Sequence, residues 1–302
     1  MFMAGIGNAG LAKGRIGRLL LLFLAAVLLV YLGVCAYLWD TQRAHIFKPI
    51  GGLQATPASV GMKFEVVHIP SGNGSGRGEL YGWWLPAEQV DAPTVLYLHG
   101  NDGNISDGYD LGRAGRLHGI GFNVLMIDYR GYGDSTGGKP SEAKVYEDAE
   151  AAWHYLLGRR ACLPQRTFIY GHSLGGAIAI ELAVHHPEAA GLIVESSFTS
   201  MMDMARLRYG PYLPVDWLLN QRFDSLGRIA RLKVPVLFIH GTSDHNVPYR
   251  MSRALYDKAP QPKYLLLVEG GKHENSSRVG WVEYRDALAA FMRKYAHPAS
   301  AR

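Results

Sequence analysis

Short apolar runs alternate with amphipathic stretches along most of this chain. Six of the runs are brief and almost wholly apolar, which is typical of buried strands. They cover residues 94–98, 124–127, 168–170, 192–194, 234–239 and 264–268. Helical stretches are expected near residues 104–117, 141–157, 175–186, 250–259 and 279–296. This alternation predicts a mostly parallel sheet with helices on both faces.

Two further strands are expected ahead of this pattern, at residues 64–69 and 79–85. The glycine-rich segment between them, residues 72–76, is typical of a hairpin loop, so this pair is expected to be antiparallel. The sequence therefore predicts one α/β domain over residues 63–297, built on a sheet of about eight strands.

An apolar block of 21 residues, 19–39, lies near the N-terminus and contains no charged side chain. Its length matches the roughly 20 residues that cross a bilayer. Basic residues precede it and aromatic residues close it: Lys13, Arg15, Arg18, Tyr37 and Trp39. No small residues at its far end mark a signal-peptide cleavage site. We predict an uncleaved signal-anchor helix.

The basic residues set the expected topology of this single-pass anchor. Residues 1–18 are expected to be cytoplasmic and residues 40–62 to form a tether. The domain is then exported, to the periplasmic side in a bacterium. Arg43 and Lys48, on the other side of the block, reduce the charge difference between its two ends.

An unusual segment at residues 197–224 interrupts the alternation of strands and helices. It is long for a plain connection and too apolar for a solvated loop. One interpretation is a helix packed on the sheet edge. The other is a short helical cap that forms the wall of a substrate pocket, with Met201, Tyr209 and Trp217 as candidate substrate-binding residues.

The charged residues give a formal net charge of +5. They are scattered, without the basic, aromatic-interleaved stripe of a nucleic-acid-binding protein, so no nucleic-acid partner is expected. A weak attraction to anionic lipid headgroups agrees better with the predicted anchor. Cys35 lies inside the predicted span and Cys162 far from it, so no disulfide is expected.

The strongest chemical signal is the pentad Gly171-His172-Ser173-Leu174-Gly175, between an expected strand and an expected helix. G-x-S-x-G at such a junction is typical of a nucleophile elbow, in which a sharp turn lifts the serine above the sheet. Ser173 needs a base and an acid, which follow it in the chain as acid and then histidine in this type of fold.

Each partner is expected directly after a later strand. Asp244 follows the run 234–239, and His273 lies in a glycine-bracketed loop after the run 264–268. We expect His273 to be the base and Asp244 to hold and stabilise its imidazole. Asp128, at the end of an earlier strand, is the alternative acid.

An oxyanion hole needs two backbone N–H donors. One is expected from Leu174, directly after the nucleophile, and the other from Asn101, in the turn after the run 94–98. The alternative for Asn101 is a side chain that only caps the next helix.

Several motifs together resemble the alpha/beta-hydrolase superfamily, and more narrowly its membrane-tethered Bem-type serine hydrolases. They are Leu98-His99-Gly100-Asn101, Asp128-Tyr129-Arg130-Gly131-Tyr132-Gly133, the Ser173 pentad, Gly241-Thr242-Ser243-Asp244 and the His273 loop. The resemblance implies the alpha/beta-hydrolase fold, a Ser-Asp-His triad and cleavage of acyl esters or thioesters, often lipid-derived. Asp102 departs from the small residue usual in that loop, and this extra carboxylate would disfavour anionic substrates.

The main hypothesis is thus a membrane-anchored serine esterase, lipase-like, acting on a small-molecule or lipid acyl substrate without cofactor or metal. A peptidase or protein thioesterase with the same triad is the alternative. A non-catalytic binding module is a third. The sequence sets no oligomeric state.

Overall fold

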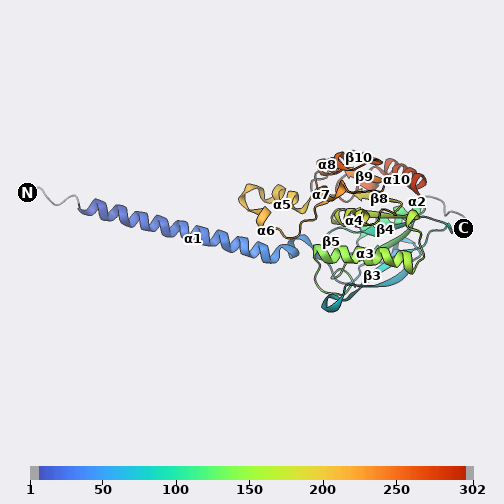
Figure 1. Cartoon of the computed structure of the whole chain (residues 1–302), viewed down its shortest axis with the longest axis horizontal. Helices are drawn as coiled ribbons and strands as arrows, with labels where there is room; N and C mark the ends of the chain where they lie inside the picture. The colour runs from blue at the N-terminus through green and yellow to red at the C-terminus, as the bar shows by residue number, and fades with distance from the viewer. Residues whose placement is uncertain (1–6, 297–302) are drawn as a thin grey trace, which may run out of the picture.

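The computed structural model describes residues 7–296, so residues 1–6 of the predicted cytoplasmic segment and residue 297 of the predicted domain lie outside the described part. Its centre is an eight-stranded sheet in the order β10-β9-β8-β7-β4-β6-β3-β2 (Figure 1). The strands are β2 (Glu65–Ser71), β3 (Gly78–Leu85), β4 (Thr94–Leu98), β6 (Asn123–Ile127), β7 (Thr167–His172), β8 (Gly191–Glu195), β9 (Val236–Gly241) and β10 (Lys263–Val268).

The strand directions follow the pattern expected from the sequence. The hairpin of β2 and β3 is antiparallel, and β3 pairs antiparallel with β6. All the remaining neighbours are parallel. The predicted mixed α/β sheet of about eight strands is therefore confirmed, and the carboxyl ends of six parallel strands share one edge.

Helices cover both faces of this sheet, as predicted. They are α2 (Gly108–Ile120), α3 (Glu142–Gly158), α4 (Leu174–His185), α7 (Ser225–Ile229), α8 (Arg250–Lys258), α9 (Ser276–Val279) and α10 (Trp281–Tyr295). Two boundaries differ from the prediction. The helix expected near 104 begins at Gly108, because the Asp107 side chain caps it by accepting from the Tyr109 N–H. The helix expected near 279 begins at Trp281 as α10, and the short α9 before it was not predicted.

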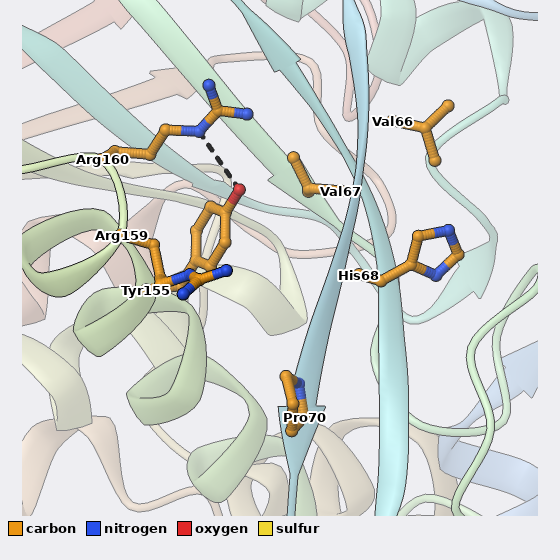
Figure 2. Close-up of a pocket in the computed structure, with 7 residues that line it drawn as sticks. All are labelled: Val66, Val67, His68, Pro70, Tyr155, Arg159 and Arg160. Atoms are coloured by element: carbon orange, nitrogen blue, oxygen red, sulfur yellow. Dashed lines mark hydrogen bonds between the residues drawn. The ribbon is translucent and has the colours of Figure 1, made fainter.

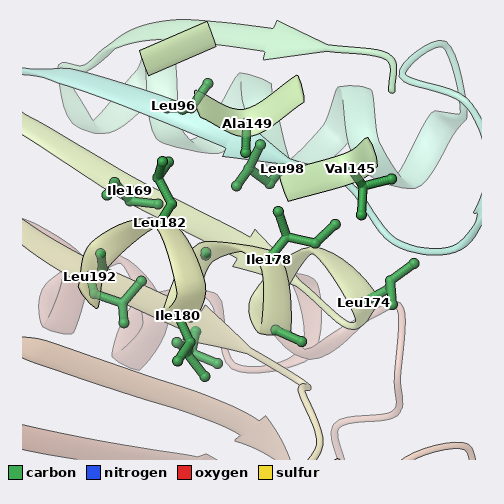
Figure 3. Packing of buried hydrophobic residues seen from close by; sticks show 14 of the residues in the cluster. Leu96, Leu98, Val145, Ala149, Ile169, Leu174, Ile178, Ile180, Leu182 and Leu192 are labelled. Atoms are coloured by element: carbon green, nitrogen blue, oxygen red, sulfur yellow. The ribbon is translucent and has the colours of Figure 1, made fainter. Parts of the chain in front are cut away.

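The side chains of alternate strand residues pack into two separate apolar cores, one on each face of the sheet. Leu96 and Leu98 of β4 face α3 and α4, whereas Val95 and Tyr97 face α2 and α10. In the first core, α4 lies directly on the strands (Figure 3). Ile178 and Leu182 are buried there, and α4 is mostly apolar because β7 and α3 enclose most of it.

The N-terminal helix α1 (Gly7–Ile46) extends away from the domain (Figure 1). Among the described residues it is the one helix long and apolar enough to cross a membrane. It continues through residues 40–46, where the sequence predicted the start of a tether.

The rest of the predicted tether lies on the domain. Phe47 is 2% exposed and packs against Phe223. Beyond it, β1 (Lys48–Pro49) pairs with β5 (Asp102–Gly103). The segment predicted as a cap forms α5 (Met201–Tyr209), a 3-10 turn (Gly210–Tyr212) and α6 (Val215–Leu218), and it projects from the domain beside α1 (Figure 1).

Candidate active site

Ser173 lies on a strained turn between β7 and α4. Its φ of 54° and ψ of −117° are unfavourable for a residue with a side chain. The turn is possible because its flanks are glycines. A Cβ on Gly171 would lie 2.1 Å from the carbonyl oxygen of Gly175, and a Cβ on Gly175 would lie 2.1 Å from that of Leu98. Ser173 is thereby held at the carboxyl edge of the sheet.

Three side chains from distant parts of the chain meet at this edge. The Ser173 hydroxyl donates to His273 Nε2, with Oγ and Nε2 3.0 Å apart. On the other side of the ring, Nδ1 of His273 donates to Asp244 Oδ2 at 2.7 Å. These bonds assign the proton of the neutral ring to Nδ1. The structure thus brings together the serine, base and acid expected from the sequence.

Asp244 is held by more donors than the sequence analysis anticipated. Its Oδ1 accepts from the N–H groups of Asn246 and Val247, and its Oδ2 accepts from His240 Nε2 at 3.1 Å as well as from His273. Burial alone would raise the pKa of Asp244, but the bonds from His240, His273 and Val247 outweigh it and hold that pKa well below its ordinary value. Asp244 is therefore ionised at neutral pH.

Asp128, the alternative acid, lies elsewhere. It follows β6, which is two strands from β7, and its Oδ1 accepts from the Ile105 N–H at 2.8 Å. It has no contact with the His273 ring among the bonds of the described residues. Its carboxyl instead lies beside the ring of His99.

Arg113, which no sequence motif indicated, contacts the His273 loop from the interior of the domain. The Nη2 atom of this buried arginine lies 2.8 Å from His172 Nε2 and 3.4 Å from the His273 carbonyl oxygen, and it donates to Glu274 at 2.8 Å. Burial and the Arg113 charge hold the pKa of His172 well below its ordinary value, so His172 is neutral. No local pattern marks Arg113, because it reaches the loop from α2.

The loop expected to supply an oxyanion donor lies against Ser173. A Cβ on Gly100 would lie 3.6 Å from the Ser173 Cβ. Asn101 follows Gly100, and its side chain donates to the Ile46 carbonyl at 2.7 Å instead of capping α2. Leu174 is the first residue of α4, so its N–H has no carbonyl partner within that helix. Leu174 thus directly follows Ser173, and Asn101 directly follows the glycine that lies against it.

The candidate pocket residues lie in different surroundings. Met201, at the start of α5, is half-buried against the core. Tyr209 is 36% exposed and Trp217 is 86% exposed. Trp217 therefore does not line an enclosed pocket, contrary to the prediction, because α6 points away from the domain toward α1.

A cleft of about 670 Å³ lies elsewhere, between the edge strand β2 and the end of α3. Figure 2 shows Tyr155 and Arg160 at one wall and His68 at the other, with Arg160 Nε donating to the Tyr155 hydroxyl. Strand β2 is four strands from β7, which is about 19 Å at the usual strand spacing. This cleft is separate from the Ser173 site.

One group of side chains could in principle hold a cation. The ligand atoms of His172, His273 and Glu274 lie within 4.8 Å of one another. However, the Arg113 guanidinium contacts His172 and Glu274 directly. That fixed positive charge opposes a metal ion at this position.

A family model and several known proteins are similar to this chain. A family model described as serine aminopeptidase, S33, matches residues 91–227. The uncharacterised protein Rv2307c of Mycobacterium tuberculosis is 37% identical over 273 residues, which cover 90% of this chain and 94% of the relative. The alpha/beta hydrolase domain-containing protein WAV2 of Arabidopsis thaliana is 31% identical over 260 residues, covering 80% of this chain and 82% of WAV2.

Among solved structures, the Pyrococcus furiosus esterase Pf2001 is similar in fold. It matches with a TM-score of 0.69 at 20% identity, over 83% of this chain and 99% of the esterase. At that identity the likeness concerns the fold alone.

Proposed function

Because this chain belongs to the alpha/beta-hydrolase superfamily, we propose that it is a membrane-anchored serine hydrolase that cleaves acyl esters through an acyl-serine intermediate. The observation that carries the proposal is the continuous hydrogen-bonded path from Ser173 through His273 to Asp244, with steps of 3.0 and 2.7 Å. A serine hydroxyl becomes a nucleophile when an oriented base accepts its proton.

The geometry supports a specific sequence of proton transfers. His273 Nε2 takes the Ser173 proton as Oγ attacks the acyl carbon, and Asp244 stabilises the imidazolium without accepting a proton. The backbone N–H groups of Leu174 and Asn101 stabilise the oxyanion of the tetrahedral intermediate. His273 then returns the proton to the leaving alcohol. Water, activated by the same base, hydrolyses the acyl-serine.

The proposed anchor is α1. Its central residues are apolar and exposed, with Leu21 68% and Leu29 69% accessible, as expected of side chains that contact lipid. We place the N-terminus of α1 in the cytoplasm and the domain on the exported side, following the basic residues before residue 19.

The decisive experiment uses the full-length protein in detergent micelles. Turnover of short p-nitrophenyl esters and labelling by a fluorophosphonate probe are measured for the wild type and for Ser173→Ala. We expect turnover to fall by about 10⁴-fold or more and labelling to disappear. Ser59→Ala, an exposed serine in a surface turn, is the matched control and should behave as the wild type. A wild type that is neither labelled nor active would point to a binding module.

A second candidate function, an aminopeptidase or other peptidase, is favoured by the match to the serine aminopeptidase family model. The same triad would act on an amide, whose amine leaving group requires stronger protonation by His273. Turnover of an aminoacyl p-nitroanilide, a short ester and an acyl thioester by the same preparation distinguishes the candidates. A higher kcat/KM for the anilide would favour the peptidase.

A further inference from the structure

We propose that the tip of the insert, residues 206–217, is a second membrane-contacting element that enters the bilayer beside α1. We call these residues the insert tip. The inference rests on the proposed anchoring by α1 and deepens the proposed function, because it assigns the substrate to the lipid layer. The partner is the bilayer that α1 spans, and the substrate class is a long-chain acyl ester resident in it.

One face of α1 packs on the insert. Tyr31, Cys35, Leu38 and Gln42 recur at spacings of four, three and four residues, which is one face of a helix. Cys35 and Gln42 are each only 8% exposed, although most of α1 is accessible. A helix that contacted only lipid would leave this stripe of side chains accessible. The burial of Cys35 and Gln42 therefore indicates that the insert packs on α1.

Polar contacts fix the insert along this stripe. Gln42 Nε2 donates to the Leu218 carbonyl at 3.1 Å, and Gln42 Oε1 accepts from the Asn220 N–H at 2.8 Å. Farther along α1, the Tyr31 hydroxyl donates to the Tyr212 carbonyl at 3.2 Å. The insert therefore follows α1 from Gln42 back to Tyr31.

This contact places the insert tip at membrane depth. Tyr31 lies inside the apolar block 19–39, eight residues before its end at Trp39. At 1.5 Å per residue, the Tyr31–Tyr212 contact lies about 12 Å on the lipid side of Trp39. Tyr212 must then lie within the membrane when α1 spans it.

The side chains of the tip suit that environment. Except for Asp216, its exposed residues are aromatic, apolar or arginine: Leu207 is 48% exposed, Tyr212 79% and Trp217 86%. Tyr and Trp concentrate at membrane interfaces, and arginine can extend its charged end toward headgroups. Arg206 is also neutralised by its ion pair with Asp216. If the insert tip lay in water, the rings of Tyr212 and Trp217 would be largely exposed to solvent and would lack apolar contacts.

The same geometry brings Ser173 close to the lipid. Ile46, the last residue of α1, accepts the bond from Asn101, next to the Gly100 that lies against Ser173. Ile46 is seven residues beyond Trp39, or about 10 Å along the helix. The carboxyl edge of the sheet therefore faces the bilayer surface, where an acyl ester could enter from the side.

The first test measures depth in the full-length protein. Tyr212→Cys, in a Cys35→Ala and Cys162→Ala background, is labelled with an environment-sensitive fluorophore and placed in phosphatidylcholine–phosphatidylglycerol nanodiscs with acyl-chain spin labels. The control is Val90→Cys, which is 99% exposed in the β3–β4 loop at the opposite edge of the sheet. We expect strong quenching at 212 and little at 90. Equal quenching at both positions would overturn the proposal.

The second test separates lipid access from chemistry. Tyr212→Ser should lower turnover of a long-chain monoacylglycerol in vesicles by about 5- to 10-fold, while hydrolysis of aqueous p-nitrophenyl acetate stays unchanged. Tyr212→Trp should restore the vesicle activity, and Val282→Ser, on the exposed side of α10, is the matched control. Equal turnover of vesicle substrate by Tyr212→Ser and the wild type would contradict the proposed role of the insert tip in lipid access. A wild type inactive on both substrates counts against the proposed function, and quenching at position 212 still decides membrane insertion.

Discussion

Glu274 accepts a 2.8 Å ion-pair bond from Arg113, a buried arginine on helix α2. The two residues differ in their surroundings, because the Glu274 side chain is 39% exposed and that of Arg113 only 1%. Glu274 follows His273 directly in the chain, so this pair ties the loop of the proposed base to α2. Arg113 also contacts Asp110 and Glu195, which makes it the centre of a buried charge cluster.

Removal of Glu274 should therefore affect activity more than stability. In Glu274→Ala the His273 loop loses one anchor, and a small displacement of the base lowers kcat by about 10- to 100-fold. The unfolding free energy should change by less than about 1 kcal/mol, because the carboxylate is partly solvated. Ester turnover and chemical denaturation in the same detergent check both. A kcat equal to that of the wild type would show that the pair does not position His273.

Removal of Arg113 should instead destabilise the fold. Arg113→Met leaves Asp110 and Glu195 in the interior without their cation, and breaking a buried ion pair in this way costs about 3–5 kcal/mol. Arg113→Lys should recover part of this loss, since it keeps the charge but not the planar set of donors. Denaturation midpoints of the two variants measure the difference. Equal midpoints in Arg113→Met and the wild type would contradict the role assigned to the cluster.

The sequence alone predicted the sheet and its helices because each strand is short, apolar and separated from the next by a helix. It also indicated which polar residues could meet, since Asp244 and His273 each follow a parallel strand and such strands end at one edge. What local pattern could not show is which side chains reach that edge from elsewhere. Arg113 is of this kind, because its partners depend on tertiary packing.

The segment after the anchor was misjudged for a related reason. Residues 47–62 contain turn-forming residues and read as a tether, yet Phe47 is buried and Asn104 donates to the carbonyls of Ile50 and Gly52. Those partners are more than 50 residues apart in sequence, so no local pattern reveals them. Likewise, the apolar composition of residues 197–224 indicated an insert but not that it lies along α1.

His240 gives a third prediction, concerning the acid of the proposed triad. His240→Ala removes one donor from Asp244 Oδ2 and also leaves Ser252, now bonded to His240 Nδ1, without that partner. A hydrogen bond to a charged group is worth about 1.5–3 kcal/mol, so kcat on short esters should fall by about 10-fold. His240→Gln, which retains an N–H donor, should lose less. The ratio of kcat values between the two variants tests the assignment.

The glycines of the elbow provide a fourth prediction. Gly175→Ala would bring a Cβ to 2.1 Å from the Leu98 carbonyl and 2.5 Å from that of His99, and neither backbone group can move freely. We expect a loss of stability on the order of 4 kcal/mol and no labelling by the fluorophosphonate probe. Gly119→Ala, in α2, has open space around the new Cβ and should be neutral or slightly stabilising. Folded, labelled Gly175→Ala would refute the steric argument.

A final prediction concerns the pH dependence of stability that arises from Asp128. Burial raises the pKa of this carboxyl group from an ordinary value of 3.8 to about 8. The folded state thus retains a proton that the unfolded chain releases, so the stability from this group is present at low pH and is lost as pH rises from about 4 to about 8. Asp128→Asn cannot ionise and keeps the acceptor for the Ile105 N–H. The difference in unfolding free energy between Asp128→Asn and the wild type should therefore increase by a few kcal/mol, in favour of the variant, as pH rises through that interval. Urea denaturation at pH 5, 7 and 9 checks this, and a difference that stays constant with pH would mean that Asp128 is ionised in the fold.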